Sequence, residues 1–419
     1  MSYDNNIQKP ELLAPAGNLE KLKMAVTYGA DAVYIGGEEF SLRVAADNFT
    51  VAEIAEGVKY AHDRNAKVYL TANVIPHNED IDDYGDFLKS VKDTGIDAVI
   101  LSDLGMFALT KEIAPDLDIH ISTQANNVNY KSAEMWYKMG AKRVILAREM
   151  SFDEIKEIRR RTPKELELEA FVHGAMCISY SGRCLLSNYM AGRDSNQGQC
   201  AHPCRWKYFL MEEQRPGEYM PVYENERGTF IYNSKDLCML PYIDKLIESG
   251  LCSFKIEGRV KSEFYVATIV KAYRTAIDNY FNSKPGEYKF DERLLDEVKK
   301  VSHRDYTTGF YFGKPGGSEQ HYESSSYIRN YDMVGVVQEY NEETKMAKVI
   351  QKNRFFKGNK IEFLRPYGDF HEQIIDYMTD EDGNEIEVAN HPQSIVYVRC
   401  DTKLEPDTFM RMERKSKSE

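Results

Sequence analysis

Long apolar runs are missing from this sequence. Runs such as AVILSD (98–103) and KRVILA (142–147) are far too short to cross a bilayer. The opening stretch, MSYDNNIQKPELLAPAG, lacks the basic segment and the apolar stretch of a secretory signal. We therefore expect a cytoplasmic protein that does not contact a membrane.

Basic residues are outnumbered by acidic ones. The chain has 419 residues, with 54 Lys and Arg against 67 Asp and Glu, and a net charge of −13. General attraction to nucleic-acid phosphates is therefore not favoured, and any such contact requires a local basic patch.

Several catalytic signatures are also absent. The sequence has no H-E-x-x-H zinc helix and no G-x-S-x-G nucleophile turn. The turn after the first expected strand reads APAGNLEKL, without the G-x-G-x-x-G that binds dinucleotides. These absences exclude the commonest zinc peptidase, serine hydrolase and dinucleotide-binding patterns.

Cysteine is scarce except in one glycine- and serine-rich stretch. Of the 7 cysteines, Cys177, Cys184, Cys200 and Cys204 lie within HGAMCISYSGRCLLSNYMAGRDSNQGQCAHPCRWKY (173–208). Cys238 follows in NSKDLC, where we expect the first turn of a helix capped by Asn233 or Ser234. In a reducing compartment such a cluster indicates metal or redox chemistry more than disulfides.

The spacing of these cysteines leaves the metal open. Structural zinc usually shows short C-x2-C pairs, which this sequence lacks, whereas iron–sulfur ligands can be widely spaced. A cysteine nucleophile paired with His173 or His202 is a third reading, but it leaves the other thiols unexplained. From spacing alone, zinc and iron–sulfur are equally favoured.

The fold pattern is α/β. Short, nearly continuous apolar runs alternate with amphipathic stretches that have start signals, such as Asn18 and the Ser151–Glu154 capping-box spacing. Eight such units in about 280 residues are typical of a TIM-like (β/α)8 barrel. The expected strands are 11–15, 31–37, 67–73, 97–103, 118–124, 142–148, 166–173 and 253–258.

The domain organisation follows from where this pattern stops. We expect the barrel over 1–282, with a long cysteine-rich insertion (174–252) before its last strand. A linker and irregular segment is expected over 283–330. Short alternating strands then predict a small antiparallel β-barrel domain over 331–414, followed by a tail at 415–419.

Four motifs make the chain recognisable: YGADAVYIGGEEFSLR (28–43), the cysteine stretch with its preceding FV, NSKDLC, and FKIEGR (254–259). They closely resemble the collagenase-like peptidase family over essentially the whole chain. Several members of that family are iron–sulfur proteins that support oxygen-independent hydroxylation. Some hydroxylate C5 of the wobble uridine of tRNA with prephenate as the oxygen donor, and others act on ribosomal RNA or in ubiquinone synthesis.

The resemblance implies a tRNA-modifying hydroxylase with a 4Fe–4S iron–sulfur cluster, prephenate as cosubstrate and tRNA as partner. A sibling family member is the candidate hetero-oligomer partner. By resemblance the cluster ligands are Cys177, Cys184, Cys200 and Cys238, with Cys204 as a spare. The alternatives are a peptidase of unknown mechanism, hydroxylation of another RNA such as rRNA, and a cluster-bearing scaffold.

Candidate substrate residues lie near the ends of the expected strands and in the cysteine stretch. Prephenate carries two carboxylates, which Arg and Lys bind through charge-assisted hydrogen bonds. The expected catalytic residues are His173, Glu257 and Asp103. The expected substrate-binding residues are Arg43, Asn73, Gln124, Arg148, Tyr180, Arg183, Lys255 and Arg259.

Overall fold

The computed structural model describes residues 8–41, 48–176, 184, 186–193, 195, 199–201, 203, 224–225, 228–229, 235–313 and 328–414. Five of the predicted site residues lie outside these ranges: Arg43, Cys177, Tyr180, Arg183 and Cys204.

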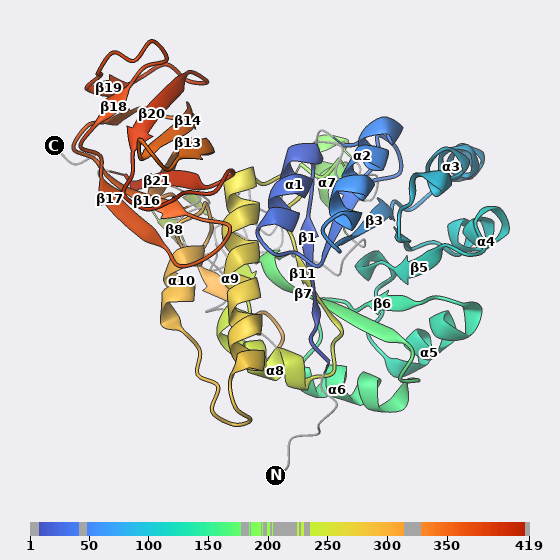
Figure 1. Cartoon of the computed structure of the whole chain (residues 1–419). Helices are drawn as coiled ribbons and strands as arrows, with labels where there is room; N and C mark the ends of the chain where they lie inside the picture. Colours follow the sequence, from blue (N-terminus) through green and yellow to red (C-terminus); the bar gives the residue numbers. More distant parts are fainter. Residues whose placement is uncertain are drawn as a thin grey trace.

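Eight parallel strands form a closed barrel (Figure 1). The sheet runs in chain order from β1 to β7, and the last strand, β11, pairs in parallel with both β7 and β1. This confirms the predicted TIM-like barrel. The strands are β1 (Glu11–Pro15), β2 (Ala32–Gly36), β3 (Lys67–Ala72), β4 (Ala98–Leu101), β5 (Asp118–Ile121), β6 (Arg143–Ile145), β7 (Glu167–Ala175) and β11 (Ser253–Ile256).

Helices surround the barrel, and their predicted start signals are confirmed. Asn18 accepts a hydrogen bond from the Lys21 amide, and Ser151 and Glu154 form the capping box. The helices outside the barrel wall are α1 (Leu19–Thr27), α2 (Val51–His62), α3 (Asn78–Val91), α4 (Leu104–Ile113), α5 (Tyr130–Met139), α6 (Phe152–Arg161), α8 (Ile243–Glu248) and α9 (Glu263–Asn282). Short 3-10 turns lie at η1 (Lys92–Thr94), η2 (Thr123–Ala125) and η5 (Leu240–Tyr242).

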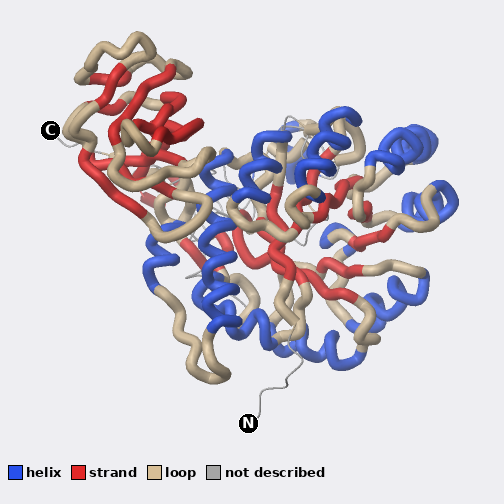
Figure 2. Tube along the Cα trace, viewed as in Figure 1, coloured by secondary structure: helices blue, strands red, loops and turns tan. Residues whose placement is uncertain are grey.

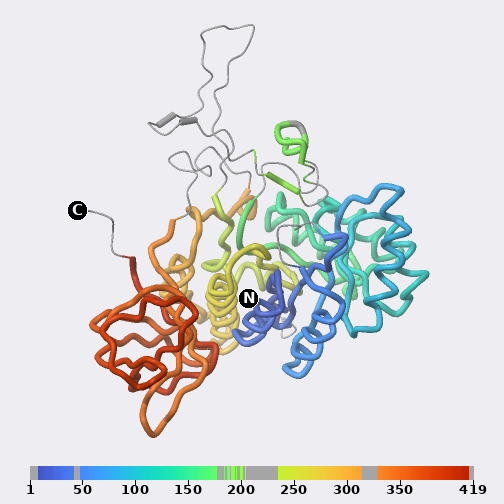
Figure 3. The backbone as a smooth tube through the Cα atoms, turned by 90° about the horizontal axis from the view of Figure 1, so that it is seen from above, coloured from blue at the N-terminus to red at the C-terminus, as the bar shows by residue number. Residues whose placement is uncertain are grey.

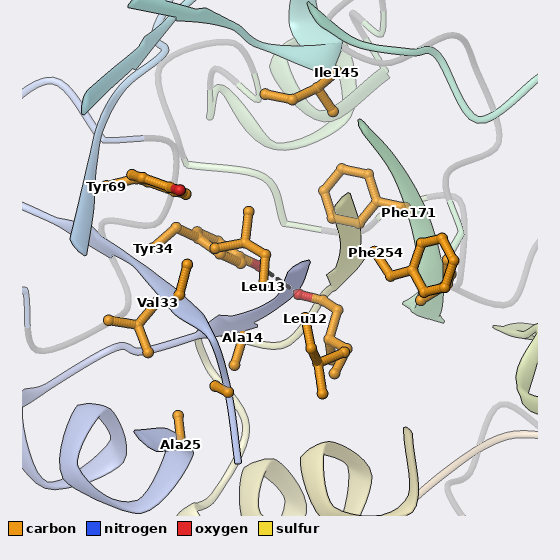
Figure 4. Packing of buried hydrophobic residues seen from close by; sticks show 14 of the residues in the cluster. Leu12, Leu13, Ala14, Ala25, Val33, Tyr34, Tyr69, Ile145, Phe171 and Phe254 are labelled. Atoms are coloured by element: carbon orange, nitrogen blue, oxygen red, sulfur yellow. Dashed lines mark hydrogen bonds between the residues drawn. The ribbon is translucent and has the colours of Figure 1, made fainter. Parts of the chain in front are cut away.

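The strands are buried on both faces, which explains their continuous apolar character. In Figure 4, Leu13 and Tyr34 point into the barrel, whereas Val33 points toward α1, which carries Ala25. The main core therefore has an inner part within the barrel and an outer part under the helices.

The segment between β7 and β11 adds strands outside the barrel. β10 (Asp236–Cys238) pairs antiparallel with the end of β7, and β12 (Tyr306–Thr307) pairs with β10. Residues 283–330, expected to be linker and irregular structure, instead contain α10 (Glu292–Val298) and β12, because Leu294 and Val298 pack into the main core. The insertion also contains α7 (Leu186–Ala191) and the pair β8 (Glu224–Asn225) and β9 (Gly228–Thr229).

The C-terminal domain is an antiparallel sheet that curves into a half-barrel with its own core (Figure 2). Its strand order is β17-β16-β21-β13-β14-β20-β18, and β15 pairs with β19 beside it. These strands are β13 (Tyr331–Asn341), β14 (Met346–Gln351), β15 (Phe355–Phe356), β16 (Lys360–Leu364), β17 (His371–Ile374), β18 (Met378–Thr379), β19 (Val388–Ala389), β20 (Ile395–Arg399) and β21 (Phe409–Glu413).

The half-barrel packs against the barrel helices on one side of the molecule (Figure 3). Leu364 and Phe409 belong to the main core, and the Tyr28 hydroxyl donates to the carbonyl of Leu364 at 2.8 Å. Arg411 of β21 is fully buried and pairs with Glu297 of α10 at 2.5 Å. The domains thus share both apolar packing and buried charge.

Within the described ranges, no helix combines the length and apolar character needed to cross a membrane.

Candidate functional site at the barrel mouth

Polar side chains link non-adjacent strands across the carboxyl-terminal end of the barrel, which we call the mouth. Arg148, just after β6, donates through Nη2 to Oε2 of Glu257, just after β11, at 3.1 Å. β7 lies between β6 and β11 in the sheet, so this pair passes over the end of β7. Nη1 of Arg148 also donates to the carbonyl oxygen of Ala175 at 2.8 Å. Arg148 therefore joins Glu257 to the end of the strand that leads into the cysteine stretch.

A second link joins β11 to β3. Nη1 of the buried Arg259 donates to Oγ1 of Thr71 at 3.1 Å, passing over the ends of β1 and β2. A Cβ on Gly36 would lie 2.1 Å from this Nη1 and 2.5 Å from Oγ of Ser41. Glycine at this position therefore leaves the space that the Arg259 guanidinium occupies.

A third link crosses over β4. Nδ2 of Asn73, after β3, donates to Oγ of Ser122, after β5, at 3.2 Å. The backbone amide of Gln124, in η2, donates to the same oxygen at 3.2 Å. The structure therefore brings Asn73, Gln124, Arg148, Glu257 and Arg259 to the mouth, as expected from their positions after the strands. Their roles in substrate binding or catalysis remain predictions.

Lys255 lies inside the barrel, deeper than the residues of the mouth. Its Nζ is 3.1 Å from Oε1 of Glu169 and 4.4 Å from the centre of the Tyr34 ring. Burial lowers the pKa of Lys255, and the charge of Glu169 opposes this effect. Because Glu169 already binds this ammonium, a carboxylate of a substrate would have to compete with it. Substrate binding by Lys255 stays a prediction.

Arg143 binds three carboxylates toward the other end of the barrel. Its Nη1 is 2.6 Å from Oε1 of Glu11 and 2.9 Å from Oε2 of Glu169, and its Nε donates to Oε2 of Glu167 at 2.8 Å. Burial would raise the pKa of Glu11, but the contacts with Arg143 more than offset it, so this pKa is lowered. Its place opposite the mouth indicates a structural function.

His173 faces away from the mouth. The partners of Phe171 and His173 on β11 are the consecutive residues Lys255 and Ile256, so β7 has an extra residue, Val172, and bulges there. The His173 ring consequently lies 5.5 Å from the ring of Tyr273 on α9, outside the barrel wall. Burial lowers the pKa of His173 to about 3, so its imidazole is neutral at pH 7. A catalytic role for His173 is still a prediction, and a charged proton donor is not favoured.

Asp103 caps a helix. Its Oδ1 accepts from the amides of Gly105 at 2.7 Å and Met106 at 3.1 Å, at the start of α4. This arrangement accounts for an acidic residue after β4 without catalysis. Substitution of Asp103 can distinguish the predicted catalytic role from helix capping.

Asparagine caps helices as well as aspartate does, but it cannot exchange a proton at pH 7. We therefore expect Asp103→Asn to keep the unfolding midpoint and the activity of the native chain. Asp103→Ala should cost about 1 kcal/mol of unfolding free energy because the cap is lost. Thermal unfolding and turnover of the three proteins check this. A stable Asp103→Asn protein without activity would restore the catalytic role.

Two of the described cysteines, Cys184 and Cys200, lie beside α7. The carbonyl of Cys184 accepts from Oγ of Ser195 at 2.6 Å, and the amide of Ala201, next to Cys200, donates to Oγ of Ser187 at 2.9 Å. Cys184 and Cys200 are both partly exposed. Their role as metal ligands remains a prediction.

Cys238 does not lie in the first turn of a helix, as the sequence predicted. It ends β10 because residues 236–238 pair with 173–175 of β7, and Pro241 delays helix formation to η5 and α8. Without a helix terminus, burial raises the pKa of the Cys238 thiol to about 12. Binding of iron would therefore have to displace a proton.

The strand pairing fixes the position of Cys238 but does not test the proposed ligand set. In the antiparallel register Cys238 pairs with His173, and Ala175, two residues before the predicted ligand Cys177, pairs with Asp236. Among the described residues, no three His, Cys, Asp or Glu side chains are grouped for a metal. Cysteine thiolates are chemically suitable ligands for an iron–sulfur cluster. The ligand set remains a prediction, because Cys177 and Cys204 lie outside the described ranges.

Two mouth residues were missed by the sequence reasoning. Asn127 is 1% exposed, and neither polar atom of its amide has a hydrogen-bond partner in the described part of the chain. Glu149 is partly buried, and burial raises its pKa. In the sequence, Asn127 lies in the polar segment QANNVN (124–129), and Glu149 follows Arg148 directly. Only tertiary contacts distinguish these two residues from ordinary loop residues.

Proteins of known name are similar to this chain over both of its domains. The chain is 45% identical to "tRNA hydroxylation protein P1" of Bacillus subtilis (strain 168), over 96% of this chain and 95% of that protein. It is 39% identical to "tRNA hydroxylation protein P" of Escherichia coli (strain K12), over 91% of each chain. The "23S rRNA 5-hydroxycytidine C2501 synthase" of Escherichia coli (strain K12) is 33% identical over 73% of this chain and 46% of that protein.

Two family models match the chain. Residues 17–321 match "Peptidase family U32", and residues 329–411 match the C-terminal domain of the same family. The first match covers the barrel from α1 onward with its insertion, and the second covers the half-barrel as far as β21. The chain belongs to peptidase family U32.

Proposed function

We propose that this protein is a tRNA-modifying hydroxylase. In this proposal it adds a hydroxyl group to C5 of the wobble uridine, with prephenate as the oxygen donor and a 4Fe–4S cluster bound by Cys177, Cys184, Cys200 and Cys238. The observation that carries the proposal is the 45% identity to a tRNA hydroxylation protein over 96% of this chain. This likeness spans the mouth, the cysteine stretch and the half-barrel together.

Arg148 is the best-placed described cation for a carboxylate of the donor. Its Nη1 and Nη2 are held by Ala175 and Glu257, and its buried Nε has no hydrogen-bond partner among the described residues. Glu257 would compete with a carboxylate of the donor, as Glu169 does at Lys255, but Arg148 lies at the mouth and its guanidinium is already fixed. Binding would therefore cost little side-chain entropy. The same contacts place Arg148 beside the strand that leads to Cys177.

A bound cluster would supply one-electron redox chemistry next to the mouth. The protein's own contribution is to hold the donor and the nucleobase in the correct orientation. Because a mouth of this kind cannot reach C5 of a stacked base, the uridine must leave the stack and enter it. Parts of the mouth are already lined with amide and hydroxyl groups, from Asn73, Ser122 and Asn127.

Deletion of the gene, followed by mass spectrometry of tRNA nucleosides, tests the proposal. We expect 5-hydroxyuridine and its derivatives at the wobble position to disappear and to return when the gene is supplied on a plasmid. A host with a second uridine hydroxylase requires deletion of both genes before complementation. Unchanged tRNA nucleosides in that double deletion would refute the proposal. Loss of an rRNA hydroxyl instead would favour the rRNA substrate that the 33% identical relative suggests.

A further inference from the structure

Two asparagines on one side of the mouth have amide atoms that the fold leaves unused. Oδ1 of Asn73, and both Oδ1 and Nδ2 of Asn127, are buried and have no hydrogen-bond partner in the described part of the chain. A buried polar atom left without a partner costs about 1–3 kcal/mol. Such groups are retained where a ligand completes their hydrogen bonds.

Both asparagines belong to the arc of the mouth between β3 and β6. Asn73 reaches over β4 to Ser122. The carbonyl of Asn127 accepts from the amide of Ala147 at 3.2 Å, which places Asn127 beside the residue that precedes Arg148. In the strand order, β3 lies across the barrel from β7, the strand that leads into the cysteine stretch.

We propose that Asn73 and Asn127 bind the Watson–Crick edge of the substrate nucleobase and select uracil. This inference rests on the proposed function. Nδ2 of Asn73 is held by Ser122, so its Oδ1 is presented as an acceptor, which matches the N3–H donor of uracil. Nδ2 of Asn127 offers a donor for the adjacent ring carbonyl. Cytosine has an acceptor at N3 and fits Oδ1 of Asn73 poorly.

The ring geometry agrees with chemistry on the opposite side of the mouth. In a pyrimidine, the C5–C6 edge lies across the ring from N3. A base held at N3 by the β3–β5 side therefore turns C5 toward β7 and β11. Glu257 lies on that side, and the guanidinium of Arg148 reaches it through hydrogen bonds to Ala175 and Glu257. Carboxylate ligands are a poor alternative for these amides, because the unpaired Oδ1 atoms of both asparagines would repel them.

A double-mutant cycle between protein and base tests this. Full-length, anaerobically purified protein is titrated with anticodon stem–loop RNA that carries uridine or 3-methyluridine at the wobble position. 3-Methyluridine lacks the N3–H donor, so we expect the native protein to bind it about tenfold more weakly. Asn73→Leu should weaken the uridine RNA by about the same factor and bind the two RNAs almost equally, because it removes the acceptor for N3–H. Asn127→Leu should weaken the binding of both RNAs by about the same factor, because the hydrogen bond to the ring carbonyl is lost.

The controls separate folding from recognition. Asn390→Leu makes the same change at an exposed position of the half-barrel and should keep the full preference. Asn73→Asp keeps the side-chain volume and the acceptor and should keep the preference, whereas Asn127→Asp lacks the donor and should weaken the binding of both RNAs. Thermal unfolding verifies that every variant is folded. If the folded Asn73→Leu protein keeps the tenfold preference for uridine, or the folded Asn127→Leu protein binds the uridine RNA as tightly as the native protein, the inference is wrong.

The outcome for the proposed function is read separately, from wobble-uridine hydroxylation in the complemented deletion strain. If the native gene restores hydroxylation and the asparagine variants restore it at an equal rate, only the inference fails. If the native gene restores none, the proposed function fails and the inference fails with it.

Discussion

Replacing Cys238 with alanine is expected to remove the bound iron while leaving the barrel folded. In the proposed set, four thiolates bind the cluster, and loss of one exposes iron to solvent and oxygen. The anaerobically purified native protein should contain roughly four iron atoms per chain. Its cluster should give a broad absorption band at about 400 nm. Cys238→Ala, Cys184→Ala and Cys200→Ala should each lose most of the iron, the absorption band and the hydroxylation.

Cys252 provides the matched control. It is a free cysteine just before β11, at the end of the barrel opposite the mouth, where its Sγ contacts the carbonyl of Leu168. Cys252→Ala should keep the iron and the activity. Equal iron in the Cys238→Ala and native proteins would contradict the ligand set, and so would equal loss in Cys252→Ala. If the Cys204→Ala protein keeps the absorption band and the Cys200→Ala protein loses it, Cys204 is excluded as a cluster ligand.

Arg143→Met should give the largest loss of stability of any single change considered. Arg143 is 4% exposed, and its removal would leave Glu11, Glu167 and Glu169 close together without their shared cation. Breaking a buried ion pair from one side costs about 3–5 kcal/mol. We expect the urea midpoint of the barrel, followed by circular dichroism, to fall by an amount that corresponds to this range.

Arg160→Met is the control for that experiment. Arg160 forms a pair with Glu157 on the exposed face of α6, with 65% and 43% of the two side chains exposed. Exposed pairs contribute at most about 1 kcal/mol, because water and salt screen them. Similar urea midpoints for the Arg143→Met and Arg160→Met proteins would show that the buried network is not important for stability.

The barrel could be predicted because each strand carries its own signal. DAVYIGG and KVYLTAN are continuous apolar runs because both faces of a parallel strand are covered. The cap of α1 at Asn18 and the capping box at Ser151 are local patterns in the same way. Positions after the strands then brought Arg148, Glu257 and Asn73 to the mouth by topology alone.

Features that depend on pairing between distant segments could not be predicted. NSKDLC reads as a helix start, but residues 236–238 form a strand only because the end of β7 is available to them. The bulge at Val172 leaves no trace in FVHG, yet it decides that His173 faces α9. Four charged residues from β1, β6 and β7 converge inside the barrel, although each looks like a surface residue in its own segment.

The strand β12 has a consequence for how the protein can be divided. It comes after residue 282, where the sequence pattern of the barrel stops, but it supports β10 and, through β10, the strand that precedes Cys177. A fragment cut at residue 282 would deprive Cys238 of this neighbour and uncover the surface that Leu294 and Phe409 occupy. The barrel therefore does not end where its sequence pattern stops. Removal of the half-barrel would expose the flank of the barrel on which Leu364 and Phe409 now pack.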